Sequence, residues 1–142
     1  MRHSIPLKVA AAVEVVFGLP LLLAPQWLVS QYGAPALGPS GIYNSMLLGG
    51  SLLAFAIMNW VASGAPAAHA RTVVVGNVAG NVLGLLVTLQ RQLFSPDAVP
   101  AGWVNVLIYL AFSVLFLVLY RSLRGGDAAV PAEGRTAAAA GP

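Results

Sequence analysis

The chain has no cysteine among its 142 residues, and charged side chains make up only 8% of it. The missing cysteine excludes disulfides, thiolate nucleophiles and thiolate metal sites. The scarcity of charge, with 58% hydrophobic residues and a mean hydropathy of +0.83, excludes an ordinary soluble domain, in which about a quarter of residues are charged. His3 and His69 lack a neighbouring carboxylate cluster, and no nucleotide or phosphate motif occurs, so we expect neither a metal site nor a cofactor.

Four apolar runs are long enough to cross a bilayer, which takes about 20 helical residues. They cover residues 7–29, 41–62, 72–93 and 103–120. The connectors between them are short and contain Gly or Pro, so neighbouring helices should run antiparallel. The sequence therefore predicts an all-α integral membrane protein, a four-transmembrane-helix up-down bundle over residues 1–124. Residues 125–142 are mostly Gly, Ala and Pro without a periodic apolar face, and they predict a disordered tail.

The cations lie at the ends of the apolar runs, where topology signals are found: Arg2, Lys8, His69, Arg71, Arg121 and Arg124. The first connector has no charge, and the third has Arg91 balanced by Asp97. This bias predicts that both termini of the membrane protein lie in the cytoplasm. The aromatic residues near the run ends agree with it: Trp27, Trp60, Trp103 and Tyr120. The expected partner is the lipid bilayer, and we expect no nucleic-acid partner.

Small residues recur at four-residue spacing on three of the runs. They are Ala10 and Gly18 on the first, each four residues from Glu14, then Gly41, Ser45 and Gly49 on the second, and Gly76, Gly80 and Gly84 on the third. Association of helices in lipid depends on close backbone packing, which such stripes allow. The stripes predict tight helix contacts, either within the chain or with a further copy or another membrane protein.

Glu14 is the only charged side chain between Lys8 and Arg71, and it lies inside the first apolar run. A carboxylate at the bilayer centre costs about 2.5–3.5 kcal/mol on insertion scales, so it is expected to face the bundle interior. At about 1.5 Å rise per residue, Asn77 and Asn81 on the third run lie at a similar depth. If these two helices are neighbours, the amides can hydrogen-bond Glu14, and the three residues form the predicted polar site.

Three functions remain open for such a site. The first is a structural or accessory bundle in which Glu14 ties helices together. The second is a proton-coupled carrier of a small or lipophilic solute, because a carboxyl group that is neutral in one state and ionised in another couples carriers to protons. The third is a membrane enzyme with Glu14 as acid or base, although no catalytic partner is apparent. The aromatic face of the fourth run could form core or a ligand-stacking wall: Asn105, Tyr109, Phe112, Phe116 and Tyr120.

Two resemblances accompany these residues. The stretch from Glu14 to Trp27, with Gly49-Gly50 and the Gly-Asn repeat of the third run, resembles uncharacterised four-helix bacterial membrane proteins of the DoxX-like and DUF4345-like families. That resemblance implies an inner-membrane protein without an assigned reaction. The lone carboxylate in the first of four short helices is also similar to the small multidrug resistance transporters. This second resemblance implies alternate binding of a cation and a proton at Glu14.

Overall fold

The computed structural model describes residues 3–127, with side chains described as far as residue 124. The elements in this part of the chain are α1 (Ser4–Leu23), α2 (Pro25–Gln31), α3 (Pro39–Ser63), α4 (Ala67–Phe94) and α5 (Gly102–Asp127). The four long helices are each apolar and long enough to cross a membrane. This confirms the all-α class with four candidate spans. Residues 125–127 continue α5, and the rest of the predicted tail lies outside the described residues.

The first predicted span, residues 7–29, is interrupted in the structure. Helix α1 ends at Leu23, and Ala24 leaves the helical conformation with φ −146° and ψ 56°. The cause is Pro25, because its ring disfavours helical geometry at the preceding residue. Pro25 is then the first residue of α2, a position where its missing N–H costs nothing. The span is therefore α1 alone, and the seven-residue α2 follows it as a separate short helix.

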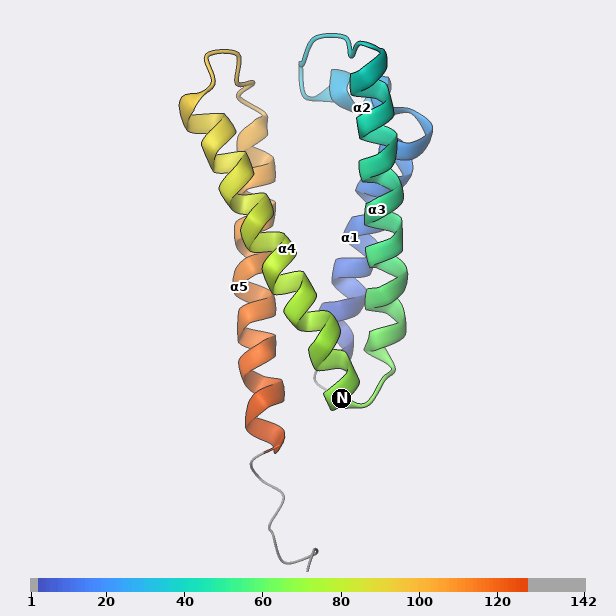
Figure 1. The fold of residues 1–142 in the computed structure, drawn as a ribbon, viewed down its shortest axis with the longest axis vertical. Helices are drawn as coiled ribbons and strands as arrows, with labels where there is room; N and C mark the ends of the chain where they lie inside the picture. Colours follow the sequence, from blue (N-terminus) through green and yellow to red (C-terminus); the bar gives the residue numbers. More distant parts are fainter. Residues whose placement is uncertain (1–2, 128–142) are drawn as a thin grey trace, which may run out of the picture.

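The long helices form two antiparallel pairs, α1 with α3 and α4 with α5. Contacts between the pairs are sparse and join α3 to α4 and α1 to α5, while α1 and α4 do not meet directly. Figure 1 shows α4 beginning next to the end of α3 and then running away from α1 and α3. The pairs thus lie close at the end that holds the start of α1, the α3–α4 connector and the end of α5, and they diverge toward α2 and the α4–α5 connector.

The backbones of α1 and α3 approach each other closely at two glycines. A Cβ atom added to Gly49 would lie 2.7 Å from the Gly18 carbonyl oxygen and 2.9 Å from the Leu21 carbonyl carbon. Both of those atoms belong to the α1 backbone, so only glycine fits at this distance. The expected packing role of small residues thus describes Gly18 and Gly49 well, and Ala10 is buried in the core where the helix pairs meet.

The other predicted small residues differ in what they face. Gly84 lies under the ring of Tyr109, which joins α4 to α5. A Cβ atom on Gly76 or Gly80 would have no heavy atom within 4 Å, so the expected close packing at these two glycines is not found within the chain. Gly41 faces Leu37 of the preceding connector instead of another helix, and Ser45 is half-buried on α3.

A compact core fills the end where the helix pairs meet. Its buried side chains come from all four long helices: Leu7, Ala10, Ala62, Ala70, Val74, Phe116, Leu119 and Leu123. Around this end, His3 Nε2 lies 3.0 Å from the Ala65 carbonyl oxygen, and Lys8 Nζ lies 5.5 Å from the centroid of the Trp60 ring. Many large apolar side chains point outward along the helices, as expected where lipid tails replace water.

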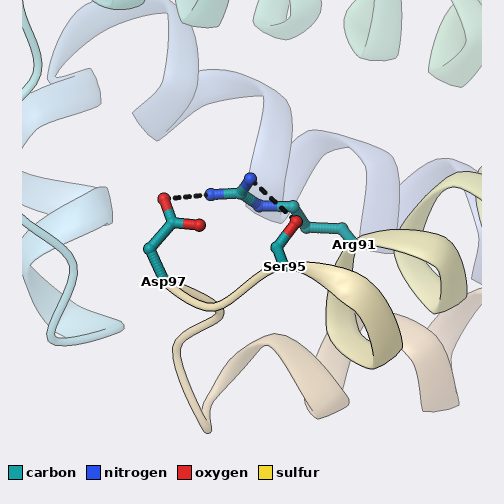
Figure 2. A network of polar contacts seen from close by, with 3 residues as sticks. All are labelled: Arg91, Ser95 and Asp97. Atoms are coloured by element: carbon teal, nitrogen blue, oxygen red, sulfur yellow. Dashed lines mark hydrogen bonds and ion pairs between the residues drawn. The ribbon is translucent and has the colours of Figure 1, made fainter.

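At the opposite end, a polar network closes the connector between α4 and α5 (Figure 2). Arg91 donates to Ser95 Oγ at 3.0 Å and to Asp97 Oδ2 at 2.6 Å. The hydrogen bond from Arg91 holds the pKa of the Asp97 carboxyl below its usual value. Both side chains are more than half exposed, so solvent screens the pair.

We expect Asp97→Asn to leave the melting temperature at neutral pH close to that of the wild type, because exposed ion pairs contribute little to stability. The lowered pKa gives the pair a stabilising effect that is present above the unfolded-state pKa and lost as pH falls through the folded-state value. Thermal unfolding of purified protein in detergent at pH 7 tests this. A melting temperature several degrees below that of the wild type would contradict this prediction and show that the ion pair contributes substantially to stability.

Candidate functional site

Glu14 projects from the middle of α1 toward α3. Asn59 Nδ2 donates to both carboxylate oxygens, Glu14 Oε1 and Oε2, each at 2.9 Å. The close approach of α1 and α3 at Gly18 and Gly49 brings the short asparagine side chain within reach of the carboxylate. Because a carboxylate can accept about four hydrogen bonds, Asn59 satisfies only part of its capacity.

Asn59 also joins the two helix pairs. Asn77 Nδ2 donates to Asn59 Oδ1 at 2.7 Å, and Asn59 Nδ2 lies 3.3 Å from Asn77 Oδ1. Asn77 Nδ2 additionally donates to the Val73 carbonyl oxygen at 2.9 Å. Asn59 is fully buried and Asn77 is 3% exposed, so these amides satisfy each other without water. Glu14, Asn59 and Asn77 form one polar cluster across α1, α3 and α4.

The predicted site was therefore partly wrong in its connections. Asn77 reaches Glu14 only through Asn59, because α1 and α4 are not neighbours. Asn81 does not bond the carboxylate in the structure; its Nδ2 donates to the Asn77 carbonyl oxygen of its own helix at 2.8 Å. Sequence reasoning missed Asn59, although it is the one amide within the apolar stretch 52–62 and that isolation was the available signal.

A cavity of about 730 Å³ lies between the two helix pairs, and Glu14 is on its wall. All four long helices contribute to the lining, which is mostly apolar. Its polar groups include Asn77, Asn81 and Thr88 on α4 and Asn105 and Tyr109 on α5. Volumes of about 300–1,000 Å³ with an apolar wall and a few polar groups are typical of small-molecule sites. Gly76 and Gly80 line this space, which explains why nothing packs on them.

The aromatic face of α5 forms part of the core and also part of the cavity wall. Phe116 is 1% exposed and belongs to the core, where it stacks on Phe112 with ring centroids 6.1 Å apart. Tyr109, Phe112 and Phe116 also line the cavity. Tyr109 fixes the position of this wall because its ring rests on Gly84 of α4.

The cavity extends from the core to the connectors at the opposite end of the molecule. Ala10, Asn77 and Phe116 border it where the core seals the gap between the pairs. At the other end, the lining continues to Tyr32 and Ala34 after α2 and to Val99 and Gly102 near the start of α5. Burial raises the pKa of the Tyr32 hydroxyl. The cavity therefore runs from the Glu14 cluster to the connectors at the end opposite the start of α1.

The described part of the chain contains no group of three or more His, Asp or Glu side chains that could hold a metal ion. Within that part, the only other titratable groups on the cavity wall are the Tyr32 and Tyr109 hydroxyls. The arrangement can thus hold an apolar molecule and offer a carboxylate to one polar group of it. No protein-family model, curated protein or solved structure matches this chain.

Proposed function

We propose that this multi-pass membrane protein binds a lipophilic small molecule in the cavity between its two helix pairs. The observation that carries the proposal is that Glu14 lines a cavity of about 730 Å³ instead of being enclosed by helix contacts. A carboxylate that only tied helices together would be surrounded by partners. Glu14 is half-buried, is held on one side by Asn59 and faces open space on the other.

In this proposal the two amides have a structural role and the carboxylate has a binding role. The Asn59–Asn77 pair is buried and mutually satisfied, so it holds the two helix pairs together at the end where they meet. Glu14 keeps unused acceptor capacity toward the cavity and is the polar anchor for the ligand. The structural function that the sequence predicts for the cluster, tying helices together, is thus assigned mainly to the amides.

Orientation in the membrane follows from charge. Arg71, Arg121 and Arg124 belong to the end of the molecule where α1 begins and α5 ends. The positive-inside bias would put this end, with both termini, in the cytoplasm. The connector end of the cavity would then lie toward the outside of the inner membrane. A proton-coupled carrier would use the same cavity.

Filling the cavity tests the binding function independently of charge. The variant Gly80→Leu adds an isobutyl group on the cavity wall, at a position where a Cβ atom would have no heavy atom within 4 Å, so the protein should fold normally but lose cavity space. We expect binding of tritiated tetraphenylphosphonium and triphenylphosphine oxide to nanodisc-embedded protein to weaken about tenfold or more for whichever probe the wild type binds. Retention by protein nanodiscs over empty nanodiscs is the measurement.

Ala79→Leu is the matched control, because Ala79 is the neighbouring exposed residue of α4 outside the cavity wall. It adds the same side chain toward lipid and should bind like the wild type. If neither probe binds the wild type, or Gly80→Leu binds as the control does, the binding proposal fails. The purely structural function, supported by the complete Asn59–Asn77 pair, is then the one that stands.

A further inference from the structure

The polar side chains on the cavity wall differ in whether their hydrogen-bond donors are already used. Ser51, Asn81 and Thr88 each donate to a backbone carbonyl oxygen of their own helix. In contrast, within residues 3–124 neither the Asn105 amide nor the Tyr109 hydroxyl has a hydrogen-bond partner. Both residues are only half-buried, so these donors can be reached from the cavity. An unpaired donor in an apolar space is costly, and an acceptor placed there would remove that cost.

Asn105 and Tyr109 lie together on one face of α5, because residues four positions apart share a helix face. A Cβ atom added to Gly84 would lie 2.7 Å from Tyr109 Cζ, the ring carbon that bears the hydroxyl. Gly84 thus makes room for the ring, and the hydroxyl is held where α5 touches α4. Since α4 and α5 run antiparallel (Figure 1), Asn105 lies near the level of Thr88.

This pair of donors lies at a different depth from the Glu14 cluster. Asn77 belongs to that cluster, and Thr88 lies about 16 Å farther along α4 at 1.5 Å per residue. Apolar side chains, among them Leu83 and Phe112, line the wall as well. An ionised carboxylate accepts hydrogen bonds and donates none, so Glu14 offers nothing to an acceptor atom of a ligand. The α5 donors supply what Glu14 lacks.

The chemistry of the two donors selects an uncharged acceptor. Asn105 offers two N–H groups and Tyr109 one O–H group, and both side chains are neutral. Among the described residues, the cavity wall contains no Lys, Arg or His side chain. An anionic group would therefore lose its water without gaining an opposite charge. A carbonyl or phosphoryl oxygen leaves water at lower cost and can accept from both donors.

We infer that Asn105 and Tyr109 form a subsite that binds a carbonyl or phosphoryl oxygen of an uncharged lipophilic ligand. This inference rests on the proposed binding function and adds its substrate class and the residues that select it. Apolar ketones, amides and phosphine oxides share this chemistry. Their hydrophobic groups would occupy the apolar part of the cavity beside the subsite.

Two probes of similar size test the subsite. Triphenylphosphine oxide has a phosphoryl oxygen, and triphenylmethane has none, so we expect wild-type protein in nanodiscs to bind the oxide more tightly. Tyr109→Phe removes one donor and keeps the ring on Gly84. It should weaken oxide binding about three- to tenfold, the effect of one lost hydrogen bond, and leave triphenylmethane binding unchanged. Asn105→Leu should weaken oxide binding to a similar extent.

Tyr120→Phe is the matched control, because it removes the same hydroxyl from α5 at a position outside the cavity wall. It should bind both probes like the wild type. Infrared spectroscopy of the bound oxide gives a readout that altered packing alone would not move. Hydrogen bonding weakens the phosphoryl bond, so its stretching band should lie at higher wavenumber in Tyr109→Phe than in the wild type.

Three results would overturn the inference and leave the proposed function intact. The first is unchanged oxide binding in Tyr109→Phe or in Asn105→Leu, with Gly80→Leu still weakening it. The second is an equal loss of oxide and triphenylmethane binding in Tyr109→Phe, which would indicate a change of cavity shape. The third is binding of tetraphenylphosphonium but not of the oxide to the wild type. If neither of these two probes binds the wild type, the proposed function itself fails.

Discussion

Gly49→Ala is expected to destabilise the protein by about 1–3 kcal/mol, the usual cost of overpacking a closely packed site. The added methyl group would lie 2.7 Å from the Gly18 carbonyl oxygen and 2.9 Å from the Leu21 carbonyl carbon. Because these are backbone atoms of α1, no side-chain rotation relieves the clash, and the two helices must move apart. Reversible unfolding in mixed detergent micelles, followed by circular dichroism, measures the change.

Gly50→Ala is the control for this prediction. Gly50 adjoins Gly49 in α3, but a Cβ atom there has no heavy atom within 4 Å. Replacing glycine by alanine inside a helix otherwise favours folding by up to about 1 kcal/mol, so Gly50→Ala should be as stable as the wild type or more stable. Equal stability of the two variants would contradict the assignment of Gly49 as a close α1–α3 backbone contact.

The same pair of glycines shows how far the sequence predicts the fold. Runs of bilayer length predict helices reliably, because a span must satisfy its own backbone groups inside lipid. Spacing identified Gly49 and Gly80 equally as small residues on a helix face, yet one touches α1 and the other faces a cavity. Periodicity shows which face of a helix carries the small residues. It does not show which helix, or which cavity, that face meets.

The candidate site was predicted in part for the same reason. Glu14 stands out as one charge in a long apolar run, and Asn77 was found by matching depth along the helices. A direct bond from Asn77 to Glu14 depended on α1 and α4 being neighbours, whereas α1 pairs with α3. Asn59 is about 6 Å from the end of α3, at 1.5 Å per residue, and depth alone therefore gave no reason to connect it with Glu14.

Asn59 is the residue whose loss should weaken the cluster most. Its single amide contacts Glu14 on α1 and Asn77 on α4, so it is the one side chain that links three helices within the cluster. We expect Asn59→Leu to cost about 2–3 kcal/mol, because it removes the donor from the Glu14 carboxylate and leaves the buried Asn77 amide with Val73 as its one remaining partner in the described cluster. Unfolding in mixed micelles again measures the free energy.

A double-mutant cycle separates this pairing from simple loss of volume. In the Asn77→Leu background, the Asn59→Leu substitution no longer removes a hydrogen-bond partner from an amide on α4. The loss of unfolding free energy caused by Asn59→Leu should therefore be smaller than in the wild-type background. Met58→Leu, an outward-facing neighbour on α3, should have almost no effect. Strictly additive effects of Asn59→Leu and Asn77→Leu would show that the amide pair does not join α3 to α4. A non-additive result would show that the Asn59–Asn77 hydrogen bonds hold α3 to α4 at the end where the helix pairs meet. From that end the two helix pairs diverge and form the cavity around Glu14.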